Sequence, residues 1–263
     1  MRILVVSDLH IHGPEDPLYT SLLRLLDEEL ERGDTLILAG DVFDLFIGNK
    51  PVFIERYALF LEGLKRATQR GAELHYIEGN HDFQIRGAFA NIRNLTVYTH
   101  HLIFQKCGKK FFVAHGDTVD RSDRRYRLLR VFFRSPFMKA VVKLMPGTMV
   151  DKIGRRGSRS SRNGNPILVS EMAPRVQLRI RHSFRNFAVE KISQGYDFVI
   201  LGHCHDLDEM TFSLSGRRGQ YANVGYPRAH GSFLVWTPGA QTFKREAMPG
   251  MNAAHSDASV PKV

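Results

Sequence analysis

The feature that most constrains this chain is an apolar run that stops at a glycine and a carboxylate. Residues 36–39 are apolar, and Gly40-Asp41-Val42-Phe43-Asp44 follows directly. A short apolar run bounded by a turn residue is typical of a strand buried in a parallel sheet. Ligands of open α/β sheets bind beyond the carboxyl ends of the strands. Asp41 is therefore predicted to lie at a ligand site.

Four more apolar runs end with Asp, Asn or His just after the predicted strand. They are residues 4–6 before Ser7-Asp8-Leu9-His10, 74–77 before Gly79-Asn80-His81-Asp82, 111–113 before His115-Gly116-Asp117, and 198–200 before Gly202-His203-Cys204-His205. Carboxylate and amide oxygens suit hard divalent cations, and imidazole suits manganese, iron and zinc. We therefore predict one two-metal site in which Asp41 is the carboxylate shared by both ions.

The order of the predicted elements indicates an α/β fold with a parallel sheet. Apolar residues at helical spacing alternate with strand-like runs, which gives strands at 2–6, 35–39 and 73–77 and helices at 18–32 and 51–70. This β-α-β-α-β order favours parallel pairing. Two further runs, 102–105 and 110–114, flank Cys107-Gly108-Lys109, and this pattern predicts a hairpin.

The composition changes after residue 120. Residues 121–145 are basic and apolar together, residues 152–162 are rich in Arg, Ser and Gly, and residues 168–193 have helical spacing. We interpret 120–194 as a helical insertion in which 152–162 form a loop. Residues 208–246 contain short β-like runs and are predicted to form an antiparallel second sheet. The main domain then spans 1–247, and residues 248–263 are predicted to be a disordered tail.

Composition limits the surroundings of the protein. The chain has 263 residues, a formal charge of +10 and two cysteines, too few for a disulfide framework. No apolar run approaches the roughly 20 residues of a membrane span, and the chain enters a strand at once, which leaves no room for a signal peptide. These features favour the cytoplasm. The positive charge favours an anionic partner: a phosphorylated substrate, a nucleic acid or an anionic membrane surface.

The five motifs together resemble the signatures of the calcineurin-like metallophosphoesterases, over residues 4 to about 240. The resemblance implies a four-layer α/β/β/α sandwich and two divalent ions, usually Mn²⁺ in bacterial members. It implies that one ion is held by Asp8, His10, Asp41 and His205, and the other by Asp41, Asn80, His115 and His203. It also implies that Asn80 stabilises charge on the reacting phosphate and that His81 protonates the leaving group.

Within that family the sequence is similar to the UDP-2,3-diacylglucosamine hydrolases of lipid A biosynthesis. The similar segments are residues 43–48, 80–83 and 115–118, together with Asp123 and Tyr126. That subfamily usually has Arg where this chain has His81, and Trp where it has Phe46. The resemblance implies that Asp123, Tyr126, Asn80 and Phe46 contact substrate, and that the insertion is a lid over acyl chains. The reaction would release UMP and 2,3-diacylglucosamine 1-phosphate.

Two other functions stay open at this point. A phosphoesterase for a soluble phosphodiester, nucleotide or nucleic acid would also use the positive charge. A scaffold that has lost catalysis is the other class, but such a protein would be expected to lack one or more of the ligands. Large apolar side chains within 121–145 favour the acyl-chain lid over a nucleic-acid arm, although they would equally fit an amphipathic helix packed on its own domain.

The same segment suggests attachment to a membrane. Each Lys or Arg near an anionic surface contributes about 1 kcal/mol, so three or four of those in 121–145 would give reversible attachment of roughly 3–4 kcal/mol. We therefore expect a cytoplasmic protein that is peripheral to the inner membrane and binds its anionic surface. We infer no obligate protein partner from the sequence.

The shared carboxylate gives the first test. Replacing Asp41 with Asn removes a charge that both ions are expected to use, so both sites should weaken together and hydrolysis should be lost. Metal content and turnover of the purified variant measure this, with circular dichroism as the control for folding. Two bound ions and a near-normal rate would contradict the two-metal assignment.

Overall fold

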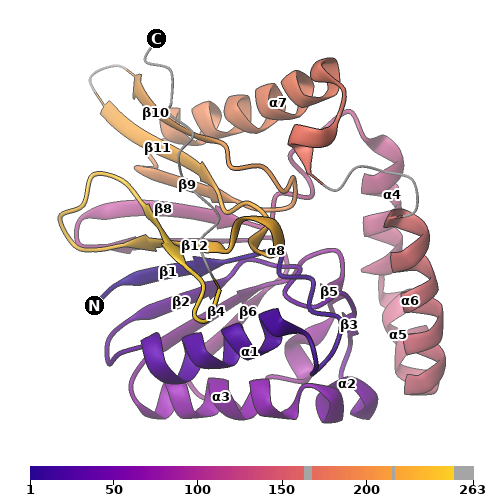
Figure 1. Ribbon diagram of the computed structural model, residues 1–263. Helices are drawn as coiled ribbons and strands as arrows, with labels where there is room; N and C mark the ends of the chain where they lie inside the picture. The colour runs from indigo at the N-terminus through magenta and orange to yellow at the C-terminus, as the bar shows by residue number, and fades with distance from the viewer. Residues whose placement is uncertain (163–167, 215–216, 252–263) are drawn as a thin grey trace.

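The computed structural model describes residues 1–162, 168–214 and 217–251 and contains two sheets that face each other (Figure 1). The first sheet has the strand order β13-β12-β1-β2-β4-β6. Its parallel strands are β1 (Ile3–Val6), β2 (Thr35–Leu38), β4 (Glu73–Ile77) and β6 (Leu95–Tyr98). Two antiparallel strands, β12 (Ser232–Trp236) and β13 (Lys244–Ala247), extend it beyond β1.

The second sheet has the order β10-β11-β9-β8-β7. Its strands are β7 (His101–Lys106), β8 (Lys109–Ala114), β9 (Phe198–Leu201), β10 (Glu209–Leu214) and β11 (Arg217–Asn223). The β7–β8 hairpin is confirmed. A short parallel pair, β3 (Phe46–Ile47) with β5 (Asp82–Phe83), lies beside the first sheet and connects the loop after Asp41 to the Gly79–Asp82 segment.

Helices cover both outer faces of the sheet pair. One side carries α1 (Pro17–Arg24), its π-helical continuation Leu25–Glu29, α2 (Pro51–Arg56) and α3 (Ala58–Gln69). The other carries α7 (Pro174–Ser193), after a 3₁₀ turn at Val169–Glu171. Short helical turns at Ile85–Gly87 and α8 (Pro227–His230) complete the framework. Figure 1 shows α1 and α3 below the sheets and α7 above them.

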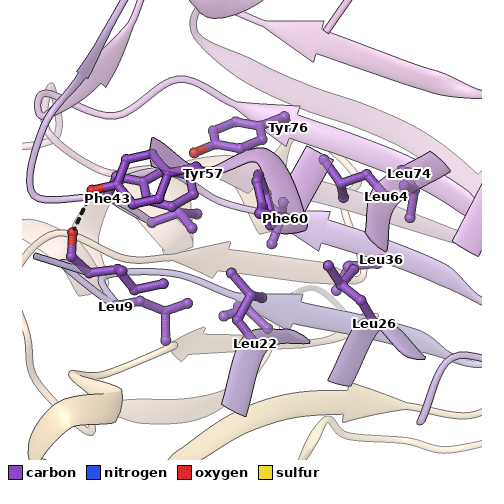
Figure 2. Packing of buried hydrophobic residues seen from close by; sticks show 14 of the residues in the cluster. Leu9, Leu22, Leu26, Leu36, Phe43, Tyr57, Phe60, Leu64, Leu74 and Tyr76 are labelled. Carbon is purple, nitrogen blue, oxygen red and sulfur yellow. Dashed lines mark hydrogen bonds between the residues drawn. The ribbon is translucent and has the colours of Figure 1, made fainter. Parts of the chain in front are cut away.

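Three apolar cores hold these layers together. Figure 2 shows the first, where Leu22 and Leu26 and, from α3, Phe60 and Leu64 meet the strand residue Leu36. The second lies between the two sheets and is built mainly from β-branched and aromatic side chains. In the third, Phe184, Ala188 and Ile192 of α7 pack on the outer face of the second sheet. Burial of alternate strand faces on both sides explains why these strands are almost continuously apolar.

Three helices lie to one side of this sandwich, at the right of Figure 1: α4 (Arg124–Phe133), α5 (Pro136–Leu144) and α6 (Gly147–Arg162). Polar contacts attach them to the sandwich. Arg56 of α2 forms two hydrogen bonds of 2.8 and 2.7 Å with the carboxylate of Asp151. At the end of α4, Arg134 contacts Glu78 at 2.5 Å and the carbonyl of Gly79 at 2.7 Å. These three helices are therefore anchored in part on the segment that carries Asn80 and His81.

The structure corrects several expectations. The segment 152–162 is part of helix α6 and not a loop. Val150 at the start of this helix is buried in the first core and Gly154 lies against Leu45, and this packing outweighs the weak helix propensity of Gly and Ser. Helix α7 begins at Pro174 and not at 168, and it is a layer of the sandwich although it lies within 120–194. The predicted helix 51–70 is two helices that meet at Tyr57.

The C-terminal strands also differ from the prediction of one antiparallel sheet. Strands β12 and β13 join the first sheet, while β11 pairs in parallel with β9 in the second. Met248, at the start of the predicted tail, is buried in the first core. The remainder of that tail, residues 252–263, lies outside the described residues.

Candidate active site

Five of the seven predicted metal ligands have left-handed backbone conformations. Asp8, His10, Asp41, His203 and His205 have φ values of 55°, 46°, 52°, 70° and 54°. Such values are uncommon for residues other than glycine and cost of the order of 1–3 kcal/mol each. In each case the chain turns sharply just after a strand, which directs the side chain across the carboxyl edge of the sheets. Strain concentrated in this way is typical of functional sites.

The first cluster contains Asp8, His10 and His205, whose ligand atoms all lie within 4.8 Å of one another. His10 Nε2 is 3.1 Å from His205 Nε2, and His205 Nε2 is 3.4 Å from Asp8 Oδ1. The other carboxylate oxygen of Asp8 accepts hydrogen bonds from the hydroxyl of Ser7 and, at 2.9 Å, from the backbone N–H of His203. Asp8 Oδ1 accepts no hydrogen bond within the described residues. It is therefore oriented as a metal ligand would be.

The second cluster contains Asp41, His115 and His203, with Asn80 beside it. His115 Nε2 lies 3.0 Å from Asn80 Oδ1, 3.2 Å from His203 Nδ1 and 3.4 Å from Asp41 Oδ2. On its far side His115 donates its Nδ1–H to the carbonyl of Ala39 at 3.0 Å. That hydrogen bond fixes the tautomer of the neutral imidazole, in which the Nε2 lone pair would face a bound metal ion.

Asp41 lies between the two clusters. Its Oδ2 is 3.8 Å from His10 Nε2 on one side and 3.4 Å from His115 Nε2 on the other. Its Oδ1 accepts the backbone N–H of His81 at 2.9 Å. The structure thus brings all seven predicted ligands together in two adjoining groups, and Asp41 is the residue placed to serve both. The assignment of each ligand to an ion stays a prediction.

The electrostatics of the clusters fit divalent cations. Asp8 and Asp41 are fully buried carboxylates within one small region, an arrangement that requires compensating positive charge. Although burial opposes its charged form, the carboxylates of Asp41 and Asp8 raise the pKa of His115 to about 10. Burial lowers the pKa of His10 to about 3 and that of His203 to about 4. Those two imidazoles are neutral at pH 7, the form that binds a metal.

Glycines allow the motifs to approach one another. A Cβ at Gly79 would overlap the carboxylate and backbone nitrogen of Asp41, and one at Gly202 would overlap the side chains of Ser7 and Asp8. Asp82 then ties two motifs together: its carboxylate accepts the N–H groups of Asp41 at 3.0 Å and Gly79 at 2.9 Å. Asp82 is thus the buried support of the site.

The position of His81 suits a proton donor. Its Nδ1–H donates to the carbonyl of Asp44 at 2.9 Å, and the Asp44 carboxylate lies 3.8 Å from the same nitrogen. These contacts orient the ring and direct its other nitrogen away from Asp44. The His81 ring centroid is 4.9 Å from that of His10, so the group borders the metal clusters. Its role stays a prediction.

The predicted substrate contacts are not all supported. Phe46 is fully buried among Phe43, Phe53 and Tyr57, so the prediction that it contacts substrate is wrong. Instead, the backbone N–H of Phe46 donates to the carbonyl of His81 at 3.0 Å and holds that loop. Burial follows from the strand pairing of β3 with β5, which directs Phe46 into the core.

Asp123 and Tyr126 both line the cleft over the metal clusters, and both have structural contacts. Asp123 caps the N-terminus of α4 by accepting the N–H of Tyr126 at 2.9 Å. The hydroxyl of Tyr126 donates to Asp117 at 2.7 Å, and Arg130 of the same helix contacts Asp117 at 2.5 Å. Asp117, from the His115-Gly116-Asp117 motif, therefore connects α4 to the site.

The cleft has a volume of about 380 Å³ and contains residues that sequence reasoning missed. Tyr226 stacks on His205 with ring centroids 4.5 Å apart, and Arg179 of α7 also lines the cleft. Asp44, the second acid of the first motif, lies within 3.5 Å of His12 as well as close to His81. Tyr226 and Arg179 have no motif around them, so only the proximity of remote segments reveals them.

A second cavity, of about 320 Å³, adjoins the cleft and is almost wholly apolar. Asn80 and His81 line both spaces. The remaining lining comes from the loop after Asp44, from β3 and β5, and from α4, α5 and α6: Leu45, Ile47, Phe83, Phe133, Met138, Val142, Met145, Val150, Ile153, Gly154 and Gly157. Asn80 and His81 therefore lie at the junction of a polar cleft and an apolar cavity.

Comparison with known proteins agrees with this geometry. The sequence profile described as "Calcineurin-like phosphoesterase" matches residues 1–207. The chain belongs to the calcineurin-like phosphoesterase family. As a member it is a metal-dependent phosphoesterase, and the two clusters described above are among its candidate metal-binding groups.

Curated relatives over most of the chain carry the name UDP-2,3-diacylglucosamine hydrolase. That of Psychromonas ingrahamii is 24% identical over 234 residues, which cover 89% of this chain and 93% of the relative. That of Pectobacterium carotovorum is 26% identical over 241 residues, 90% and 96% of the two chains. A solved archaeal phosphodiesterase covers 94% of this chain and 99% of its own, with 13% identity and a TM-score of 0.46.

Replacing His81 with Ala tests the proton donor. We expect a loss of about 10²–10⁴-fold in rate for a phosphodiester with an alkoxide leaving group, because general acid catalysis is removed. The loss should shrink when the leaving group is nitrophenolate, a weaker base that needs less protonation. Bound metal should be unchanged, as metal analysis of the variant can verify. An equal loss for both leaving groups would instead mean that His81 only positions substrate.

Proposed function

We propose that this phosphoesterase hydrolyses the pyrophosphate of UDP-2,3-diacylglucosamine to UMP and 2,3-diacylglucosamine 1-phosphate. The observation that carries the proposal is the apolar cavity that meets the polar cleft at Asn80 and His81. A substrate with acyl chains on one side of its phosphates and a nucleotide on the other would use both spaces. The names of the curated relatives support the same substrate.

The size of the apolar cavity supports burial of hydrocarbon. Each methylene moved from water into such a space contributes about 0.8 kcal/mol. Its lining contains, apart from Asn80 and His81, apolar side chains and glycines, so a polar ligand would lose hydrogen bonds to water without replacement. A soluble phosphodiester would leave this cavity unused, although the formal charge of +10 would attract one.

Divalent ions, which we propose to be Mn²⁺, would be held by Asp8, His10 and His205 and by Asn80, His115 and His203, with Asp41 between them. They would supply Lewis acidity at phosphorus. The protein itself orients the reacting group. The Asn80 side chain is held against His115 and presents its amide to the phosphate, and His81, oriented by Asp44, delivers a proton to the leaving oxygen.

The α4–α6 lid supports a place at the membrane. Several large apolar side chains on it are exposed, among them Leu128 at 76%, Phe137 at 67% and Leu144 at 85%. Such a surface, set among arginines and lysines, fits the interface of an anionic inner membrane. Among the described helices none is long and apolar enough to cross a bilayer. We propose peripheral attachment through α4 and α5, from which lipid enters the apolar cavity.

Filling the apolar cavity tests the substrate. Gly157 lines it, and a Cβ there would meet no atom within 4 Å, so Gly157→Leu should enter open space and strengthen helix α6. If two or three methylenes of the acyl chain are displaced, kcat/KM for UDP-2,3-diacylglucosamine should fall about 15–60-fold. Hydrolysis of bis-p-nitrophenyl phosphate should be unchanged.

Lys152→Leu provides the matched control, because Lys152 is exposed on the same helix and does not line the cavity. An unchanged rate on the lipid substrate in Gly157→Leu would contradict the acyl-chain role. Turnover of wild-type protein, loaded with Mn²⁺, on bis-p-nitrophenyl phosphate and single-stranded DNA but not on the lipid substrate would favour a soluble phosphodiester.

Attachment to the membrane has a separate test. Vesicles that contain phosphatidylglycerol should co-sediment the protein at low salt, and high salt should remove only the electrostatic part. Phe137→Ser with Leu144→Ser should weaken the salt-resistant part, since both side chains are exposed and their replacement leaves the core intact. Equal binding to neutral and anionic vesicles, or binding to neither, would contradict the proposal.

A further inference from the structure

We propose that a basic cavity on the far side of α5, separate from the catalytic cleft, binds a phosphate group such as that of an anionic lipid. The cavity has a volume of about 670 Å³, within the range of ligand sites. Its lining comes from the loop after β3, the turn after β5, the β6–β7 turn and the helices α4 and α5. It shares only Val142 with the lining of the apolar cavity and no residue with the cleft.

The charges around this cavity do not balance. Five cationic side chains line it, Lys50, Arg86, Arg134, Lys139 and Lys143, against the single acid Glu78. Glu78 is already occupied, because one oxygen pairs with Arg134 at 2.5 Å and the other accepts the backbone N–H of Ile85 at 3.0 Å. The cavity therefore retains an excess of positive charge.

Two of the cations are fixed by the protein. The ammonium of Lys50 donates to the carbonyls of Lys143 and Met145 at 2.9 and 2.7 Å, at the end of α5. Arg134 is held by Glu78 and Gly79. These hydrogen bonds thus hold the side chains of Lys50 and Arg134 in place at the wall of the cavity.

The other three cations surround the open space. Lys139 and Lys143 are four residues apart on α5, and each is exposed. Like charges at this spacing repel each other and destabilise a helix. Arg86 faces them from the turn after β5, where it donates only to the carbonyl of Val97, at 3.2 Å, among the described residues. An anion placed between these three side chains would relieve their repulsion.

A phosphate group is the anion that this geometry fits. Arginine binds two phosphate oxygens at once through its planar fork, and lysine adds a point charge. Gln84, Thr99 and His100, which also line the cavity, offer hydrogen bonds to the remaining oxygens or to an attached alcohol. The volume leaves room for more than the phosphate itself.

The surroundings favour a lipid as the source of that phosphate. Leu144, beside Lys143, is 85% exposed, and Phe137 on the same helix is 67% exposed. An amphiphile lying along α5 could place its phosphate in the basic cavity and its chains against these side chains. In that case the cavity adds headgroup recognition to the proposed membrane attachment.

The test follows probe binding at the cavity in the metal-loaded protein. A diamagnetic ion such as Mg²⁺ permits NMR, and the amide signals of Gln84, Thr99 and His100 report the cavity locally. The probes are inorganic phosphate, sn-glycerol 3-phosphate and dihexanoyl-phosphatidylglycerol below its micelle concentration. We expect saturable shifts, and at least tenfold weaker binding in Lys139→Gln with Lys143→Gln. Tighter binding of the lipid than of glycerol phosphate would identify a lipid source, and equal binding would identify a free phosphate.

The control replaces two other exposed cations, Lys65 on α3 and Arg93 before β6, with Gln. This control removes the same net charge at positions that do not line the cavity, so it should leave binding of the probes unchanged. Equal weakening in the control, or no saturable shift with any probe, would overturn the proposal. Hydrolysis of bis-p-nitrophenyl phosphate by the Lys139 and Lys143 variant should match wild type, so failure of this site and failure of the proposed reaction would be seen separately.

Discussion

Two buried carboxylates, Asp8 and Asp41, are the constraint on which the rest of this structure depends. Neither side chain reaches solvent, and buried negative charges are tolerated only with hydrogen bonds and nearby positive charge. Left-handed turns after the strands bring imidazole rings to these carboxylates. Asp82 stabilises two of the turns by accepting the backbone N–H groups of Asp41 and Gly79. Removing the glycines at 79 or 202 would force backbone and carboxylate apart. The turns at the ends of the strands thus surround the buried carboxylates of Asp8 and Asp41 with hydrogen bonds and imidazole rings.

One short segment links the metal clusters to the helices outside the sandwich. In residues 79–82, the carbonyl of Gly79 holds Arg134 of α4, Asn80 lies against His115, and His81 lies between the cleft and the apolar cavity. Helix α4 is consequently attached to the same backbone that carries Asn80 and His81. This attachment explains how an apolar cavity, lined largely by α5 and α6, adjoins the cleft at these two residues.

The five motifs could be predicted because each is local: an apolar strand, a glycine where the chain must turn, and a ligand directly after it. Their convergence followed from the rule that the ends of parallel strands share one edge. The errors arose where packing between distant segments decided the outcome. Residues 152–162 are rich in Gly and Ser, yet Gly154 lies against Leu45 of the loop after Asp44 and the segment is helical. Phe46 follows Asp41 by only five residues, but the pairing of β3 with β5 turns it into the core.

The sequence by itself determined the α/β class, the family and the candidate ligands, because strand periodicity and the residue types that bind metals can be recognised in consecutive residues. Only the tertiary structure decided which residues line the cleft. Tyr226 stacks on His205 and Arg179 lines the cleft, although neither residue lies in a recognisable motif. The apolar cavity and the basic cavity on either side of α5 likewise exist only once the helices pack. Each cavity forms where side chains from distant segments pack together, and no local sequence pattern specifies which segments will be neighbours.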